Sequence, residues 1–232
     1  MKNVFLLGLV FGVLFPGVLE AKDSQELIDV PTAYTLQRGN FALDFKMYKE
    51  GGILTKLSLG FTDYIMLGIP IDVRKAIGDE KAQCDFPLLV CGKIRLIPSR
   101  GAIPNITVGF DPYGFSQYGT EWDKLRYLLY ISFTKKASFV DFPIDWTIGV
   151  NNDLKDFKSE DASLFGGADI SLTPELQILA DICNIKEGDK IKLNAGIRYL
   201  IQPKLEIEVS FKDLSVETPE RVIRIGYANR FF

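Results

Sequence analysis

The sequence predicts an all-β protein: an antiparallel, up-and-down transmembrane β-barrel of about twelve strands that follows a cleaved signal peptide. Three observations lead to this prediction. The chain opens with an apolar segment typical of exported proteins, and apolar and polar residues then alternate in short stretches. Turn residues separate these stretches, which follow one another in simple succession. Beyond the opening segment no stretch has good helical periodicity.

The first 21 residues have the features of a secretory signal peptide. Lys2 makes the start basic, an almost uncharged apolar run reaches Leu19, and Ala21 is the candidate last residue before cleavage. An uncleaved membrane anchor is the less favoured alternative, because the run is short and Pro16 breaks it. The predicted organisation is a signal peptide at residues 1–21, a periplasmic N-terminal lead-in at 22–39 and an outer-membrane β-barrel at 40–232.

Alternation with a period of two marks each strand. Residues 192–199 read K-L-N-A-G-I-R-Y and residues 205–211 read L-E-I-E-V-S-F, so each stretch has one apolar face and one polar face. A short turn between them completes a hairpin. In chain order, the predicted strands are residues 40–48, 53–60, 65–73, 88–96, 106–111, 127–133, 144–150, 164–172, 176–182, 192–199, 205–211 and 223–227.

The connections between these strands differ in length. Short turns are predicted at residues 61–63, 173–174 and 201–204, whereas the connections at 75–86 and 112–124 are longer and more polar. Outer-membrane barrels place short turns in the periplasm and long loops outside, and strands of about nine to eleven residues suit a tilted span. The pattern therefore predicts location in the bacterial outer membrane, with outer-membrane lipid and the barrel-insertion machinery as partners.

The polar face of the strands has two interpretations. In a secreted soluble β-sandwich it would be the wet outer surface, whereas in a barrel it would line the lumen. We favour the barrel, since sequential hairpins close naturally into an up-and-down barrel and leave no sheet edge to protect. The candidate lumen-lining residues are Lys93, Arg95, Arg126, Asp145, Asp169, Asp181, Lys192, Arg198, Glu206 and Glu208. The basic members could tune a path for anions, or they could pair with the acidic members and fill the barrel; the sequence leaves both open.

Composition excludes several classes of function. The chain has no His, so the Ser–His pair of many membrane hydrolases cannot form, and we expect no catalytic residues, no metal site and no cofactor. A glycan or lipid hydrolase based on paired carboxylates such as Glu206 and Glu208 is the less favoured alternative. The net charge of −3 argues against nucleic-acid binding. Pairing among Cys84, Cys91 and Cys183 stays open.

Several short motifs resemble the YjbH-like family of bacterial outer-membrane β-barrels. The resemblance covers most of residues 29–231, although this chain lacks the lipid-anchoring Cys of some members and is shorter than several others. It implies an outer-membrane barrel associated with exopolysaccharide production or export. The matching stretches are Pro31-Thr32-Ala33 with Gly39, Lys93-Ile94-Arg95-Leu96, Ile103-Pro104 running to Val108-Gly109, residues 142–150, residues 164–169, and Asn194-Ala195-Gly196-Ile197-Arg198-Tyr199.

These observations lead to a main functional hypothesis and two alternatives. The main one is a channel or export accessory for small or polysaccharide solutes, with a polysaccharide or a small anionic solute as its cargo. The first alternative is a structural or adhesion barrel with a plugged lumen, whose surface loops do the work. The second is a secreted soluble β-sandwich that binds a ligand.

Overall fold

The computed structural model describes residues 23–84, 89–121, 124–139, 142–155, 162–186, 191–202 and 204–231. The expected signal peptide at residues 1–21 lies outside these ranges. The strands are β1 (Asn40–Tyr48), β2 (Gly52–Gly60), β3 (Ile65–Arg74), β4 (Gln83–Cys84), β5 (Cys91–Ile97), β6 (Asn105–Asp111), β7 (Leu128–Phe139), β8 (Phe142–Asp153), β9 (Ser163–Ser171), β10 (Leu176–Ile185), β11 (Lys192–Gln202), β12 (Leu205–Lys212) and β13 (Glu220–Arg230).

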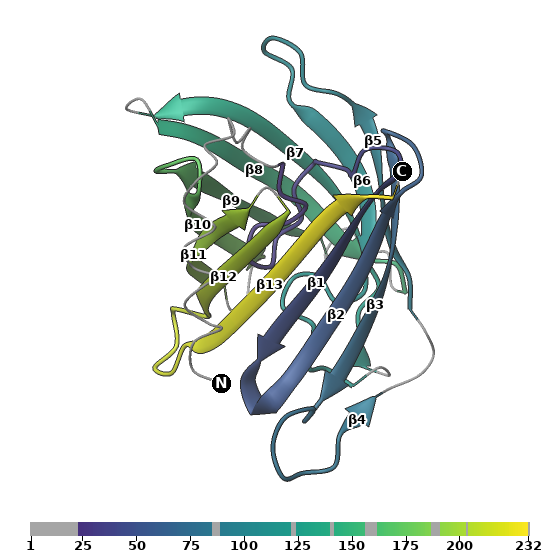
Figure 1. Ribbon diagram of the computed structural model, residues 1–232, viewed down its shortest axis with the longest axis vertical. Coiled ribbons are helices and arrows are strands. Elements are labelled where there is room, and N and C mark those ends of the chain that lie inside the picture. Colours follow the sequence, from purple (N-terminus) through teal and green to yellow (C-terminus); the bar gives the residue numbers. More distant parts are fainter. Residues whose placement is uncertain are drawn as a thin grey trace, which may run out of the picture.

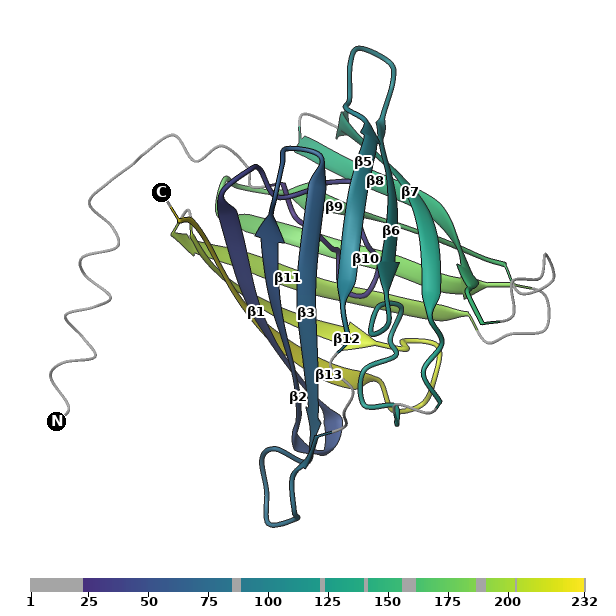
Figure 2. The same cartoon turned by 90° about the vertical axis from the view of Figure 1, so that its right-hand side faces the viewer.

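Twelve of these strands close into an antiparallel barrel (Figures 1 and 2). Each strand pairs with its neighbours in the sequence, and β13 pairs with β1 to complete the ring, with Arg230 opposite Asn40. Among the described residues, the short β4 pairs only with the end of β3. The predicted fold class is therefore confirmed, and the closed ring excludes the sandwich alternative. In the part of the chain that the structure describes, no helix has the length and apolar character needed to cross a membrane.

The two ends of the barrel differ in their connections. At the terminal end, where the chain enters β1 and leaves β13, the Phe231 N–H donates to the Gly39 carbonyl at 2.9 Å. The short turns between β2 and β3 and between β9 and β10 lie at this same end, because the strands alternate in direction. The opposite end, the loop end, carries the long connections after β3 and β6, whereas the β5–β6 connection at the terminal end is as long as the one after β12. This is the asymmetry of outer-membrane barrels.

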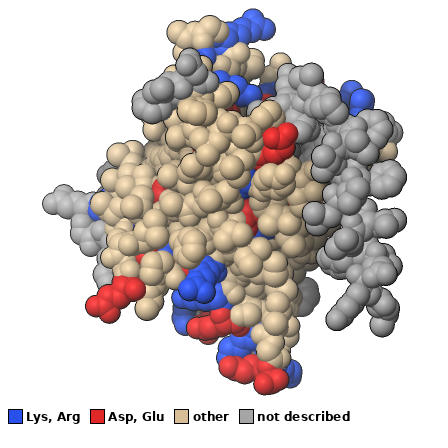
Figure 3. Space-filling model, turned by 60° about the vertical axis from the view of Figure 1, so that its left-hand side comes forward, with Lys and Arg blue, Asp and Glu red and all other residues tan. Residues whose placement is uncertain are grey.

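The outer surface of the barrel wall is apolar. On β3 the outward side chains Ile65, Leu67, Ile69 and Ile71 are all exposed, while the residues between them are buried. Charged residues are sparse across the middle of the face in Figure 3 and gather mainly at its upper and lower ends. A band of exposed aliphatic and aromatic residues is stable only against lipid. Other exposed residues of this kind on the wall are Phe45, Leu57, Ile94, Ile131, Ile148, Ile178, Leu193, Ile197, Val209, Phe211, Ile223 and Tyr227.

The inner wall is polar, but aromatic rings fill part of it. Tyr130 on β7 lies over Gly109 on β6, so that a Cβ on this glycine would be 2.3 Å from the ring. Phe165 on β9 covers Gly149 on β8 in the same way. Glycine at these wall positions gives an inward-pointing ring a flat surface on which to pack.

The N-terminal segment lies inside this wall. Residues 24–36, called the plug below, run through the ring of strands as the purple trace of Figure 1, and Gly39 then turns the chain into β1. Gly39 has a φ of 76°, a conformation that glycine adopts without strain. The sequence analysis expected residues 22–39 to be a periplasmic lead-in; the structure places most of this segment in the lumen.

Candidate functional site

The plug is a compact turn whose tip points toward the loop end. Its own backbone closes it, since the Leu27 N–H donates to the Val30 carbonyl at 2.9 Å and the Thr32 N–H to the Gln25 carbonyl at 3.2 Å. Leu27, Ile28 and Val30 are fully buried and pack in one apolar cluster with residues of β7, β9 and β10. The plug thus forms the core of a barrel whose wall is polar.

A wall carboxylate binds the tip of the plug. Asp181 on β10 accepts the backbone N–H groups of Ile28, Asp29 and Val30 with one oxygen, at 3.0, 2.8 and 3.2 Å. Asn194 on β11 donates to its other oxygen at 2.6 Å. Three consecutive N–H groups around one oxygen resemble the anion-binding nests of turns. The turn conformation at residues 28–30 is thereby held from outside.

An arginine on the wall binds the other side of the plug. Arg198 on β11 donates to the carbonyls of Glu26 and Leu27 at 3.1 and 3.0 Å and to the Ser24 hydroxyl at 2.6 Å. It also pairs with Glu208 on β12 at 2.8 Å, and both side chains are almost fully buried. The planar guanidinium can bind several acceptors at once, which a lysine cannot do with the same geometry.

The remaining backbone groups of the plug meet wall lysine and threonine side chains. Lys93 on β5 donates to the carbonyls of Gln25, Thr32 and Tyr34. Thr107 on β6 donates to the Ala33 carbonyl at 2.8 Å, and Thr134 on β7 accepts the Ala33 N–H at 2.8 Å. The wall therefore satisfies backbone groups that have no strand partner, as buried polar groups require.

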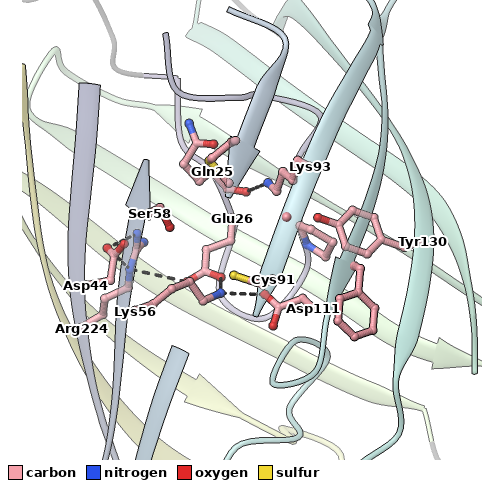
Figure 4. Close-up of a pocket in the computed structure, with 14 residues that line it drawn as sticks. Gln25, Glu26, Asp44, Lys56, Ser58, Cys91, Lys93, Asp111, Tyr130 and Arg224 are labelled. Atoms are coloured by element: carbon pink, nitrogen blue, oxygen red, sulfur yellow. Dashed lines mark hydrogen bonds and ion pairs between the residues drawn. The ribbon is translucent and has the colours of Figure 1, made fainter. Parts of the chain in front are cut away.

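Two carboxylates of the plug lie among wall cations. Glu26 lies 3.4 Å from Lys46, 3.3 Å from Lys56 and 3.7 Å from Arg224. Figure 4 shows Glu26 reaching from the plug toward Lys56 and Arg224. Burial alone would raise the pKa of Glu26, but Lys46, Lys56 and Arg224 together hold this pKa well below its usual range.

Asp29 occupies a second cationic position nearby. Its carboxylate is 3.5 Å from Lys46 on β1 and 3.2 Å from Lys212 on β12. Burial opposes the charged form, yet the two lysines and a hydrogen bond from Ser116 lower the pKa of Asp29. Because Lys46 contacts both acidic residues, the two carboxylates are neighbours on one side of the lumen.

The connection between β6 and β7 closes the lumen from the loop end. Residues 112–121, called the inner loop, fold inward, and the Phe115 N–H donates to the Asp29 carbonyl at 3.0 Å. The Ser116 hydroxyl donates to the carboxylate of the same aspartate. The Tyr118 ring lies 3.8 Å from the Lys212 ammonium, close enough for a cation–π contact. The inner loop and the plug, which enter from opposite ends, therefore meet in the lumen.

Two cavities of different size lie inside the described part of the barrel. A cavity of about 20 Å³ lies beside Glu26, Lys56, Cys91 and Lys93, which is room for about one water molecule. A larger cavity of about 320 Å³ lies at the loop end. Tyr48, Arg74, Lys75, Gly119 and Glu121 are among its lining residues.

The structure brings together part of the set of lumen-lining residues that the sequence predicted. Buried inside the barrel are Lys93, Asp169, Asp181, Arg198, Glu206 and Glu208. Asp145 lies next to them and accepts the Tyr34 hydroxyl of the plug at 2.6 Å.

Three predicted residues lie away from this group. Arg95 donates to the Asp63 carbonyl in the turn at the terminal end, Arg126 lies 3.5 Å from Asp153 near the loop end, and Lys192 is the half-buried first residue of β11.

The sequence analysis did not single out four basic residues at the centre of the lumen. Lys46, Lys56, Lys212 and Arg224 all contact the acidic residues of the plug. A signal for them was present, because Lys46 and Arg224 stand between apolar neighbours, as Arg224 does between Ile223 and Ile225, and Lys56 and Lys212 keep the same alternation on one side. No such signal marked their partners, since residues 24–36 have no strand periodicity.

Fold, apolar exterior and polar lumen together define the protein as an outer-membrane β-barrel, here with an internal plug. Comparison with solved structures agrees. The chain is similar to a KdgM porin in complex with disordered oligogalacturonate, with a TM-score of 0.55 and 14% identity over 83% of this chain and 99% of that chain. A second KdgM porin structure gives a TM-score of 0.52 and 13% identity over the same shares.

A third similar structure is the outer membrane protein Omp33 of Acinetobacter baumannii, with a TM-score of 0.46 and 10% identity over 83% of this chain and 97% of that chain. No protein-family model matches the sequence, and no curated protein matches it. The YjbH-like family expected from the short motifs is thus not named by any comparison. At these identities, the similarity to the KdgM porins shows the fold.

Proposed function

We propose that the protein is a channel for small or polysaccharide-derived solutes and not an enzyme, and that the plug closes it in the conformation described above. The observation that carries this proposal is the polar inner wall. Arg198, Glu208, Lys212 and Arg224 are each at most 3% exposed, yet they are ionisable. Replacing buried ion pairs by apolar residues of similar size is often neutral or stabilising. Charged residues on the inner wall are therefore not needed for stability of the closed barrel, but they suit a state in which water fills the lumen.

The way in which the plug is attached supports the same proposal. The plug is not part of the hydrogen-bonded ring of strands, and besides its apolar cluster it is held to the wall by many hydrogen bonds and ion pairs. Water can replace such contacts when the segment withdraws. Withdrawal toward the terminal end requires no strand to separate from its neighbours. The resemblance to the YjbH-like family would make the cargo an exopolysaccharide, and this finer assignment stays a prediction.

The test is the conductance of the barrel in planar lipid bilayers with and without residues 24–36. We expect the full chain to conduct rarely and the deletion variant to conduct steadily. Heat-dependent mobility on a gel shows whether each variant is folded, since a closed barrel resists detergent until it is boiled. A folded deletion variant with no conductance would contradict the proposal.

The second candidate function is a closed barrel that acts through its outer surface. The outer cavity of about 320 Å³ favours it, because this cavity lies at the loop end and does not need an open lumen. This candidate predicts no conductance in any folded variant, including one that lacks both the plug and the inner loop. The same bilayer experiment therefore decides between the two functions.

A further inference from the structure

We infer that Lys46, Lys56, Lys212 and Arg224 form a carboxylate-binding site on the inner wall, and that the plug occupies this site with its own Glu26 and Asp29. The solute that takes the place of the plug is then an acidic saccharide: a sugar acid or a short chain of them. This inference rests on the proposed channel function and names its substrate class. It concerns residues of four strands, β1, β2, β12 and β13, which the closure of the barrel makes neighbours.

Two wall lysines, Lys46 and Lys93, depend on the plug for their polar partners. Within the residues that the structure describes, the hydrogen bonds and ion pairs of Lys46 go to Glu26, Ile28 and Asp29. Among the described residues, the hydrogen bonds of Lys93 likewise go to the plug, to the carbonyls of Gln25, Thr32 and Tyr34. When the plug withdraws, both ammonium groups lose these partners and face the lumen. They are then free to bind another anion.

Lys212 is in a similar position. It lies 3.2 Å from Asp29 and has Glu220 as a weaker second partner at 3.8 Å. Lys56 and Arg224 differ, because each also has a close wall carboxylate: Asp111 at 2.7 Å from Lys56 and Asp44 at 2.7 Å from Arg224. The open lumen would therefore present Lys46, Lys93 and Lys212 as its available cations. Lys56 and Arg224 would stay partly neutralised by the wall carboxylates beside them.

The plug presents three kinds of polar group to the wall. Besides the two carboxylates, backbone carbonyls accept from Lys93 and Arg198, and backbone N–H groups donate to Asp181. A sugar acid offers the same three kinds of group, since each hydroxyl can donate and accept and the carboxylate carries the charge. A neutral sugar would leave the lysines without an anion. A simple inorganic anion would leave the Asp181 oxygen that binds the plug without donors.

The experiment uses the full chain in planar bilayers. Glu26→Gln combined with Asp29→Asn removes both charges of the plug while keeping its size, so we expect this double variant to open more often than the unmodified chain. Asp23→Asn is the matched control, because Asp23 pairs with the exposed Lys136 outside the plug. The probes are sodium D-glucuronate and D-glucose, which differ by one carboxylate. Binding is read as block of the current.

We expect D-glucuronate to block the double variant at a concentration at least tenfold lower than D-glucose. Adding Lys46→Gln and Lys212→Gln should remove this difference. Equal block by both sugars in an open channel would overturn the inference and leave the proposed channel function standing. If no folded variant conducts, the channel function fails, and calorimetry of the double variant in detergent decides the inference: saturable binding of glucuronate alone supports it, and no binding overturns it.

Discussion

Asp181 on β10 accepts the backbone N–H of Asp29 at 2.8 Å, so an acidic side chain of the wall binds the main chain of an acidic residue in the plug. The two carboxylates do not oppose each other directly, because that of Asp29 faces Lys46 and Lys212. Asp181 thus orders the turn of the plug, and Asp29 supplies the negative charge that pairs with the wall lysines.

Removing the wall carboxylate should loosen the plug. Asp181→Ala leaves three backbone N–H groups without their acceptor, and hydrogen bonds to a charged group are worth about 1.5–3 kcal/mol each. Even about 3 kcal/mol in total would lower the protection of residues 28–30 against hydrogen exchange by a factor on the order of 100. Asp169→Ala is the matched control, since Asp169 is also buried but does not bind these groups. Unchanged exchange in Asp181→Ala would refute this role.

The buried pair of Arg198 and Glu208 should respond differently to single and double substitution. Arg198→Met leaves the almost fully buried Glu208 with Arg224, 3.4 Å away, as its ion-pair partner among the described residues of the wall. Breaking one side of a buried pair costs about 3–5 kcal/mol, whereas replacing both sides by apolar residues is often neutral. We expect the temperature at which gel mobility shifts to fall in Arg198→Met and to recover in part when Glu208→Leu is added. A larger fall in the double variant would contradict this account.

Acid should release the plug. Folding lowers the pKa of Glu26 and of Asp29. Their contribution to stability is therefore complete above the unfolded-state carboxyl pKa of about 4. It is lost as the pH falls through the lower pKa values of the folded state. Conductance should therefore be low at neutral pH and rise below about pH 4. The charged groups that face these two carboxylates are Lys46, Lys56, Lys93, Asp181, Lys212 and Arg224.

The variant with Glu26→Gln and Asp29→Asn is the control for the acid experiment. It lacks both titrating groups, so its conductance should change much less between pH 6 and the acid range. An equally steep rise in this variant would assign the acid response to other carboxylates of the barrel.

The cysteines report on the state of the lumen. Cys84 is exposed, whereas Cys91 and Cys183 are buried and all three are free thiols. In the folded full chain, a charged maleimide should therefore label Cys84 rapidly and the other two slowly. Deletion of residues 24–36 should expose Cys91, because its sulfur lies beside the cavity next to Glu26. Mass spectrometry of the labelled peptides checks this, and rapid labelling of Cys91 in the full chain would show that the lumen is already open.

A glycine on the wall should be intolerant of a single methyl group. In Gly109→Ala the new Cβ would lie 2.3 Å from the Tyr130 ring, so the ring must move off the wall into the plug. Overpacking of this kind costs about 1–3 kcal/mol. We expect a lower temperature for the gel mobility shift and faster hydrogen exchange in the plug. Gly109→Ala combined with Tyr130→Leu should restore both, and failure to do so would locate the strain elsewhere.

The sequence was sufficient to predict the wall of the barrel. On β11 the alternation of Leu193 and Ile197 with Asn194 and Arg198 assigns one face to lipid and the other to the lumen. That assignment needs only the period of a strand, which is a local property of the backbone. For the same reason the alternation predicts Lys93 and Arg198 as lumen residues without any information about their partners.

The sequence by itself therefore determined a lipid-facing exterior, a charged interior and the succession of strands, because each depends on residues two positions apart. Only the tertiary structure decided what fills the interior. The Arg198 side chain and its acceptor Ser24 are 174 residues apart in the chain, and closure of the ring is what brings them within 2.6 Å. Residues 24–36 have no periodicity of their own. Their conformation is set by the wall that surrounds them, so the sequence pattern could not reveal it.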